Sequence, residues 1–178
     1  MNIMVELANE MNVKLHPTKS LEIAPELKGA MSTPRPFFSG CRIHFGGTVR
    51  IGCTILCGLD NLALKGILAH EFAHLKKRHS IKGLLSLLIS IPVLVYGFVS
   101  SSWPIIPILL TVTLLMLVFS LISWHHEYEA DAVAAEYVRE KDMAYALEQA
   151  AGLIHRPGDT LLHPSFKKRI SRLLSDKE

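Results

Sequence analysis

A long uncharged segment limits what this chain can fold into more than any other feature of its 178 residues. From Gly83 to Trp124, 42 consecutive residues carry no charge, and as one helix they would be about 63 Å long at about 1.5 Å per residue. The hydrocarbon core of a bilayer is only about 30 Å thick. We therefore predict two membrane-spanning helices, over about 83–99 and 105–124, joined by a turn at residues 100–104, where serines, a tryptophan and a proline cluster.

A buried helical hairpin of a soluble protein is the alternative to a membrane hairpin. A core helix usually keeps a polar face, and this segment shows none along its length. The membrane interpretation is therefore favoured. Pro92 and Pro107 would kink the two spans without abolishing them.

Basic residues predict the orientation of this hairpin. The turn between the spans has no charge, and four basic residues precede the first span: Lys76, Lys77, Arg78 and Lys82. By the positive-inside rule, both outer ends lie in the cytoplasm of a multi-pass cell-membrane protein. The net charge of +3 is too small to indicate nucleic acid, and the basic cluster is explained by the membrane surface. We expect a lipid bilayer as a partner and no nucleic acid.

The segments 1–82 and 125–178 are expected to form one cytosolic domain, into which the hairpin 83–124 is inserted. Its fold class is predicted as mainly helical α+β with a small antiparallel sheet. Apolar residues at helical spacing predict an amphipathic helix over the first fifteen residues. The chain has three cysteines, an odd number in a domain expected to face the cytoplasm, which predicts free thiols.

The sheet is expected after this first helix. Residues 17–40 indicate mostly loop with one short strand. The segment 42–51 alternates apolar and polar residues about Gly46 and Gly47, which predicts a two-residue β-hairpin. Such a hairpin would either bind an extended substrate through its edge or merely cover the core, and both readings stay open.

The helix expected next carries the sequence HEFAH. Asp60 is a good N-cap for a helix over 61–79, on which His70 and His74 lie one turn apart at the margin of the apolar face. Two such imidazoles can share one metal ion, and zinc is the usual choice for imidazole and carboxylate ligands. Glu71 adjoins the first histidine, so it can act as general base on a water at the metal. The alternative is an ordinary pair of surface histidines.

A third metal ligand is expected from HHEYEAD, directly after the apolar run. Glu127 and Asp131 stand four residues apart on one helix face. Glu127 would complete a three-ligand site, and Asp131 could hold a ligand imidazole by its ring N–H. The alternative for Glu127 is a solvated charge at a helix N-terminus. His125 and His126 point elsewhere on a regular helix and are expected at the membrane interface.

Helices are expected from the HHEYEAD segment to about residue 138, from about 141 to 154, and from near His163 onward. Four ordered features now resemble one family: HEFAHLKKRH, the apolar hairpin, EYEAD and HPSFKKRISRL. They are similar to the HtpX-type membrane zinc metalloproteases, which are gluzincins related to the CAAX prenyl endopeptidases. The resemblance covers nearly the whole chain and implies a zincin-like catalytic domain that holds one zinc ion.

The resemblance also implies roles for individual residues. His70, His74 and Glu127 match the zinc ligands of the family. Glu71 matches its catalytic base, and Asp131 matches the acid that orients a ligand. His163 and Arg169 match a late histidine and arginine that lie near the zinc and help stabilise the oxyanion. Both can donate hydrogen bonds to developing negative charge, although a capping or surface role is the alternative for His163.

The expected function is a membrane-anchored zinc metalloendopeptidase with Glu71 as its base. Its substrates would be membrane or membrane-proximal proteins, including misfolded ones, cut at the cytoplasmic face. One alternative is a catalytically silent scaffold or regulator that binds a metal structurally, although such a site has no need of Glu71. Another is a prenyl-protein protease, which normally needs a larger membrane chamber than two spans can build.

Overall fold

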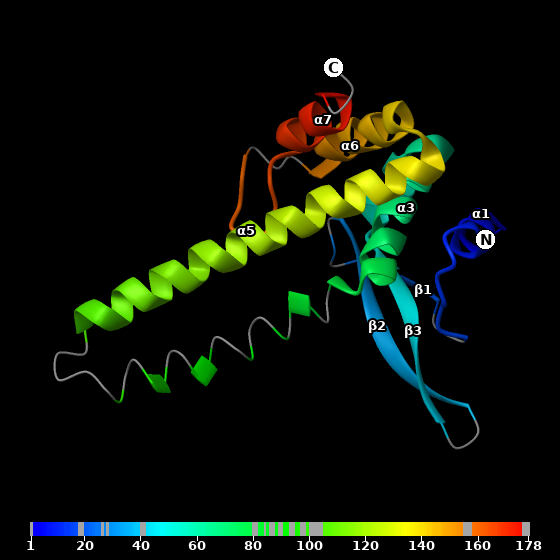
Figure 1. Cartoon of the computed structure of the whole chain (residues 1–178). Helices are drawn as coiled ribbons and strands as arrows, with labels where there is room; N and C mark the ends of the chain where they lie inside the picture. Colours follow the sequence, from blue (N-terminus) through cyan, green and yellow to red (C-terminus); the bar gives the residue numbers. More distant parts are fainter. Residues whose placement is uncertain are drawn as a thin grey trace.

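Helices form most of the described chain, and a small sheet lies beside them (Figure 1). This computed structural model describes residues 2–17, 20–25, 27, 29–39, 42–79, 105–154 and 158–175, with scattered positions between 82 and 99. In chain order the elements are α1 Asn2–Glu10, β1 Leu21–Ile23, β2 Ala30–Ser39, β3 Arg42–Ile51, α2 Cys53–Gly58, α3 Asn61–Lys77, α5 Ile105–Val138, α6 Glu140–Ile154 and α7 Phe166–Ser175. The architecture is mainly helical α+β, as the sequence predicts.

Helix α3 is the centre of the core, because α5, α6 and strands β2 and β3 all pack on it. Its N-terminus is capped as predicted, since a carboxylate oxygen of Asp60 accepts a hydrogen bond from the backbone N–H of Ala63 at 2.8 Å. Tyr145 of α6 donates to the other oxygen at 2.7 Å. Phe72 is fully buried on this helix. The helix therefore has a fixed start and a fixed packing face, which together set the direction of its histidines.

The sheet has three strands in the order β1-β3-β2. β1 runs parallel to β3, with Leu21 opposite Val49, and β2 runs antiparallel to it, with Ala30 opposite Ile51. The sheet is therefore mixed, and the prediction of an antiparallel sheet is wrong for β1. β3 pairs on both sides, so β2 is an outer strand.

The predicted hairpin within residues 42–51 is also wrong, because this whole segment is the single strand β3. Its glycines permit a close approach instead of a turn. A Cβ atom on Gly46 would lie 2.7 Å from the Cα atom of His16, and the carbonyl of Gly47 accepts a hydrogen bond from the N–H of His16 at 2.8 Å. The hairpin is formed by β2 and β3, and the two residues between them lie outside the described part of the chain.

The segment 17–40 contains two strands where the sequence predicts mostly loop with one short strand. The second, β2, has ten residues and includes Pro34 and Pro36. Proline has no N–H to donate, so its presence argues against a central strand. An outer strand tolerates it, and this is the place that β2 occupies.

The second predicted span, 105–124, and the segment that carries Glu127 form one unbroken helix. Helix α5 has 34 residues and extends from Ile105 to Val138, which at about 1.5 Å per residue is about 51 Å. Among the described residues, one helix, Leu109–Val138, is long and apolar enough to cross a membrane by length and composition, and its most apolar window is not buried. The first predicted span, 83–99, lies mostly outside the described residues, so the two-helix hairpin stays a prediction.

The last two helices, the cysteines and one short helix can also be compared with the predictions. α6 agrees closely with its predicted bounds, while α7 begins three residues after His163. Cys53 and Cys57 are free thiols, as predicted, and Cys41 lies outside the described residues. The sequence does not predict the short helix α2. It has six residues and is separated from β3 by the single residue Gly52.

Candidate active site

His70 and His74 face a common point from successive turns of α3. Their Nε2 atoms lie 3.0 Å apart, and their rings are nearly perpendicular, at 87°. His70 is only 6 % exposed, because the packing of α3 against α5 covers it. An ordinary pair of solvated surface histidines would not be enclosed in this way.

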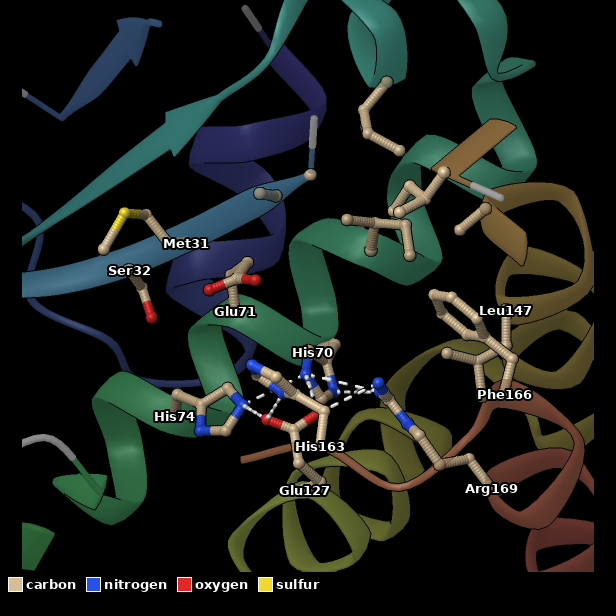
Figure 2. Close-up of a pocket in the computed structure, with 16 residues that line it drawn as sticks. Met31, Ser32, His70, Glu71, His74, Glu127, Leu147, His163, Phe166 and Arg169 are labelled. Carbon is tan, nitrogen blue, oxygen red and sulfur yellow. Dashed lines mark hydrogen bonds and ion pairs between the residues drawn. The ribbon is translucent and has the colours of Figure 1, made fainter. Parts of the chain in front are cut away.

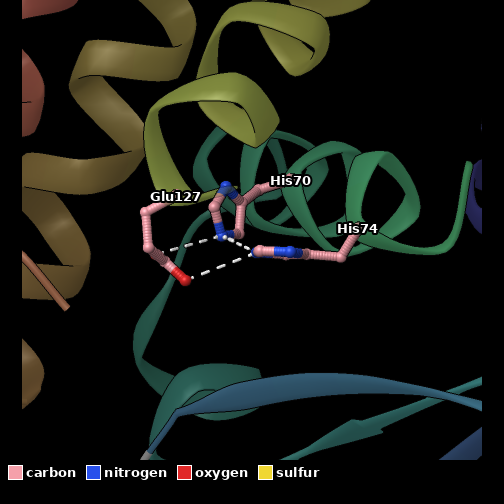
Figure 3. A group of neighbouring side chains, drawn as sticks. All are labelled: His70, His74 and Glu127. Carbon is pink, nitrogen blue, oxygen red and sulfur yellow. Dashed lines mark hydrogen bonds and ion pairs between the residues drawn. The ribbon is translucent and has the colours of Figure 1, made fainter. Parts of the chain in front are cut away.

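Glu127 reaches the same point from α5 (Figure 3). Its Oε2 lies 3.6 Å from Nε2 of His70, and its Oε1 lies 3.5 Å from Nε2 of His74. Glu127 is buried and lies more than five turns into a long helix, so it is not a solvated charge at a helix N-terminus. The packing of α5 on α3 brings together residues that are more than fifty positions apart in the sequence.

These distances suit a metal ion. Ligand atoms about 2.1 Å from a tetrahedral zinc ion lie about 3.4 Å apart. Here the two Nε2 atoms are 3.0 Å apart, and the two oxygens of Glu127 lie 3.5 and 3.6 Å from them, one oxygen to each histidine. Two imidazoles and one carboxylate are also the protein ligands of one type of catalytic zinc site, whose fourth position is left to water or substrate. The donor atoms and their spacing therefore fit zinc.

Asp131 lies one turn after Glu127 and contacts His70 from the side away from this point. Its Oδ1 is 2.9 Å from Nδ1 of His70, and the residue is 1 % exposed. A ring N–H at Nδ1 that donates to this carboxylate leaves the lone pair at Nε2 free to bind a metal.

Arg169 joins both carboxylates from helix α7. Its Nε and Nη2 donate to the two oxygens of Asp131 at 2.7 and 2.6 Å, and its Nη1 lies 2.9 Å from Oε2 of Glu127. The guanidinium is almost fully buried. Burial disfavours its charged form, but the carboxylate of Asp131 outweighs this effect and raises the pKa of Arg169. A permanent positive charge therefore lies behind the two acids.

The same contacts keep both acids ionised. Burial alone would raise the pKa of Glu127, but hydrogen bonds with His163 and His74 and the charge of Arg169 lower it well below the usual range. Burial also opposes ionisation of Asp131, whose pKa is lowered by the charge of Arg169. The group formed by His70, His74 and Glu127 thus includes a carboxylate that is ionised at neutral pH.

A cavity of about 280 Å³ lies beside these candidate ligands, and Figure 2 shows the side chains that line it. Glu71 lines it from α3 and is 6 % exposed. His163 lines it from the segment before α7, with 39 % of its side chain exposed, and its Nδ1 is 3.1 Å from Oε1 of Glu127. The outer strand β2 contributes Met31 and Ser32. All seven residues that the sequence singled out thus lie at or directly behind one cavity.

Two further residues near the site were not predicted to belong to it. His79 is 4 % exposed, and its Nδ1 lies 2.8 Å from Nδ1 of His74. Its Nε2 lies 3.0 Å from Oε2 of Glu129. His79 follows His74 by five positions, and Glu129 follows Glu127 by two. Their contact depends on the turn of the chain after α3, which the sequence pattern does not predict.

Their environments favour a neutral imidazole and an ionised carboxylate. Burial lowers the pKa of His79 to about 4, so its imidazole is neutral at neutral pH. A hydrogen bond from Lys77 lowers the pKa of Glu129 to about 2, so its carboxylate is ionised. The ring of His126 stacks on His79, with centroids 4.3 Å apart.

Fold and site define a class of protein. Two histidines separated by one helical turn, a glutamate from a second helix and a buried glutamate beside the first histidine form the arrangement of a metallopeptidase. The chain belongs to peptidase family M48, whose family model matches residues 3–177.

A solved structure shows the same fold. The chain is similar to Ste24p of S. mikatae with a TM-score of 0.63 and 17 % sequence identity. The matched region covers 97 % of this chain and 49 % of the other, so the chain spans about half the length of that protein. A search of curated proteins finds no match.

Proposed function

We propose that this chain is a membrane-anchored zinc metalloendopeptidase of the HtpX type. The observation that carries the proposal is the convergence of His70, His74 and Glu127 on one point, with Glu71 on the wall of the adjoining cavity. Membership of family M48 supports it. The four ordered sequence motifs support the HtpX-type assignment within that family.

The chemistry follows from the residues around the cavity. His70, His74 and Glu127 would hold a zinc ion, which when bound would act as a Lewis acid toward the attacking water and the peptide carbonyl. Glu71 accepts the proton of the attacking water at its carboxylate and returns it to the leaving amine. His163 donates a hydrogen bond to the carbonyl oxygen as negative charge develops there, because its ring is partly exposed to the cavity.

The role we propose for Arg169 differs from that of His163. Its Nε, Nη1 and Nη2 atoms all face carboxylates, and it is buried. We assign it to holding Glu127 and Asp131 in place, whereas the sequence motif predicts direct stabilisation of the oxyanion.

Substrate would bind along the outer strand β2. Among the described residues no strand pairs with its outer edge, and its first residues, Ala30 to Ser32, line the cavity. An extended peptide that pairs with this edge gains backbone hydrogen bonds with little dependence on sequence. Such binding suits a peptidase that cleaves unfolded segments of membrane or membrane-proximal proteins.

Anchoring would be provided by α5 and the segment before it. The apolar side chains exposed on α5 form a continuous surface over several turns: Leu109, Leu110, Leu114, Met116, Leu117, Val118 and Leu121. Trp124 ends this surface, and the ammonium of Lys168 lies over its ring at 5.0 Å. Tryptophan and lysine together are typical of a membrane interface. We propose a multi-pass protein of the cell membrane with its catalytic domain in the cytoplasm.

The substitution Glu71→Gln tests the proposed reaction. The activity of the purified variant on unfolded casein should be at least about 100-fold lower than that of the wild type, because the general base is removed. Its zinc content should not change. Glu148→Gln makes the same chemical change on the exposed face of α6 and should leave activity unchanged. Equal proteolysis by the wild type and Glu71→Gln would overturn the proposal.

Metal analysis tests the ligands separately. Wild-type protein should contain one zinc ion per chain, and Glu127→Ala should lose most of it. Undiminished zinc in that variant would overturn the assignment of the third ligand.

A further inference from the structure

We propose that His79 and Glu129 are positioning residues, which orient the ring of His74 for metal binding through a chain of hydrogen bonds. This inference rests on the proposed metal site. It goes beyond that site because neither residue faces the three ligand atoms.

The end of helix α3 brings His79 into position. Arg78 has a left-handed backbone, with φ of 56°, and its N–H bonds to the carbonyls of His74 and Leu75. This geometry ends the helix and turns the chain, so that the next residue lies beside His74 instead of continuing along the axis. The ring centroids of His74 and His79 are 4.9 Å apart.

The hydrogen bonds along this chain allow a placement of protons that suits metal binding at Nε2 of His74. Glu129 is an acceptor, so Nε2 of His79, at 3.0 Å, carries the hydrogen and donates it. A neutral ring that is protonated at Nε2 has its lone pair at Nδ1. Nδ1 of His79 therefore accepts a hydrogen bond from Nδ1 of His74 at 2.8 Å. The remaining nitrogen of His74, Nε2, is left with a free lone pair, and it is the atom that faces Glu127 and His70.

Neighbouring side chains hold both members of the chain. The ammonium of Lys77 lies 2.9 Å from Oε1 of Glu129, and that of Lys82 lies 4.0 Å from Oε2. The ring of His126 stacks on His79 with an interplanar angle of 9°. The orientation of His79 is thereby fixed both at its edge and on its face.

The two histidine ligands thus have different supports. His70 meets the carboxylate of Asp131 directly at 2.9 Å, whereas one imidazole separates His74 from the carboxylate of Glu129. Partners of this kind fix the tautomer and ring orientation of a ligand, and their loss typically weakens metal binding by about 10–100-fold.

Zinc affinity, measured on the full chain in detergent by competition with a chelator, tests the inference. His79→Phe keeps a ring but removes both hydrogen bonds, and it should weaken zinc binding by about 10–100-fold. His79→Asn restores an acceptor for Nδ1 of His74 and should recover much of that loss. Glu129→Gln keeps the shape of the side chain and removes its charge, so it should weaken binding less than His79→Phe does. His125→Phe is the matched control outside the chain of hydrogen bonds and should bind zinc as the wild type does.

The outcomes separate this inference from the proposed function. Wild-type protein that binds no zinc would overturn both. Zinc bound by the wild type and equally tightly by His79→Phe would overturn the inference alone. Equal weakening in His79→Phe and His79→Asn would show a packing role and also overturn it. If His79→Phe fails to fold, Glu129→Gln decides, because unchanged zinc affinity in that variant would overturn the role of Glu129.

Discussion

Arg169 and Asp131 form a bidentate ion pair between helices α7 and α5, with Nε–Oδ2 and Nη2–Oδ1 separations of 2.7 and 2.6 Å. The planar guanidinium fits both carboxylate oxygens at once. Asp131 also contacts His70, and Arg169 also contacts Glu127. The C-terminal helix therefore helps to determine the geometry of a site whose candidate ligands all lie on α3 and α5.

Arg169→Met should destabilise the fold strongly. It leaves Asp131 and Glu127 buried without their positive partner, which typically lowers the free energy of unfolding by about 3–5 kcal/mol. Arg169→Lys should be intermediate, because an ammonium cannot serve both carboxylate oxygens in the same plane. Urea unfolding followed by circular dichroism measures both variants. Arg139→Met breaks an exposed ion pair with Asp142 and should change little, and a similar loss there would contradict this explanation.

Asp131→Asn should act on metal binding more than on shape. The amide keeps the size of the side chain but loses the charge that holds Nδ1–H of His70, so zinc affinity should fall by about 10–100-fold. Asp159→Asn is the control, because Asp159 forms an exposed ion pair with Lys168 away from the ligands. Zinc affinity that is unaltered in Asp131→Asn would show that His70 needs no such support.

The sequence predicts the site better than the sheet, for a physical reason. His70 and His74 are four residues apart on one helix, so their common direction follows from helical geometry alone. Glu127 is more than fifty residues from these histidines in the sequence. It is four residues from Asp131 on its own helix, so these two side chains also share one face. Their convergence with α3 is expected because two histidines need a third metal ligand, and the resemblance to a family adds to this expectation. Helix geometry alone does not predict it, because helix packing is not a local property of the chain.

The sheet depends on contacts that a local pattern does not contain. Pro34 and Pro36 are compatible with β2 only because it is an outer strand, and that place is set by the pairing of β3 with β1. Gly46 and Gly47 suggest a turn in the sequence, but in the structure they allow the backbone of His16 to lie close to β3. His79 was similarly missed, because its contact with His74 needs the left-handed residue that ends α3.

Gly46→Ala should destabilise the protein. The new Cβ atom would lie 2.7 Å from the Cα atom and 2.8 Å from the backbone nitrogen of His16, so backbone must move, and overpacking of this kind typically costs about 1–3 kcal/mol. Gly152→Ala is the matched control, since its Cβ atom meets nothing within 4 Å in helix α6. Alanine should stabilise that helix by about 0.5–1 kcal/mol. Thermal melting that shows Gly46→Ala to be as stable as the wild type would contradict the close approach.

His74 should make the stabilisation by zinc depend on pH. Burial alone would lower its pKa, but the hydrogen bond with Glu127 and the nearby carboxylates outweigh burial and raise the pKa of His74 above its ordinary value of 6.5 in the metal-free protein. The bound proton therefore stabilises the metal-free fold below pH 6.5, and this contribution is lost as the pH rises through the raised pKa of His74. Zinc must displace the same proton.

The difference in melting temperature between zinc-loaded and chelator-treated protein should consequently grow as the pH rises from about 6 to about 8.5, and level off above the raised pKa of His74. Glu127→Gln removes the charge that raises this pKa, so in that variant any remaining zinc stabilisation should reach its plateau at a lower pH. A difference that is constant across this range, or largest at the acidic end, would show that His74 does not exchange a proton for the metal.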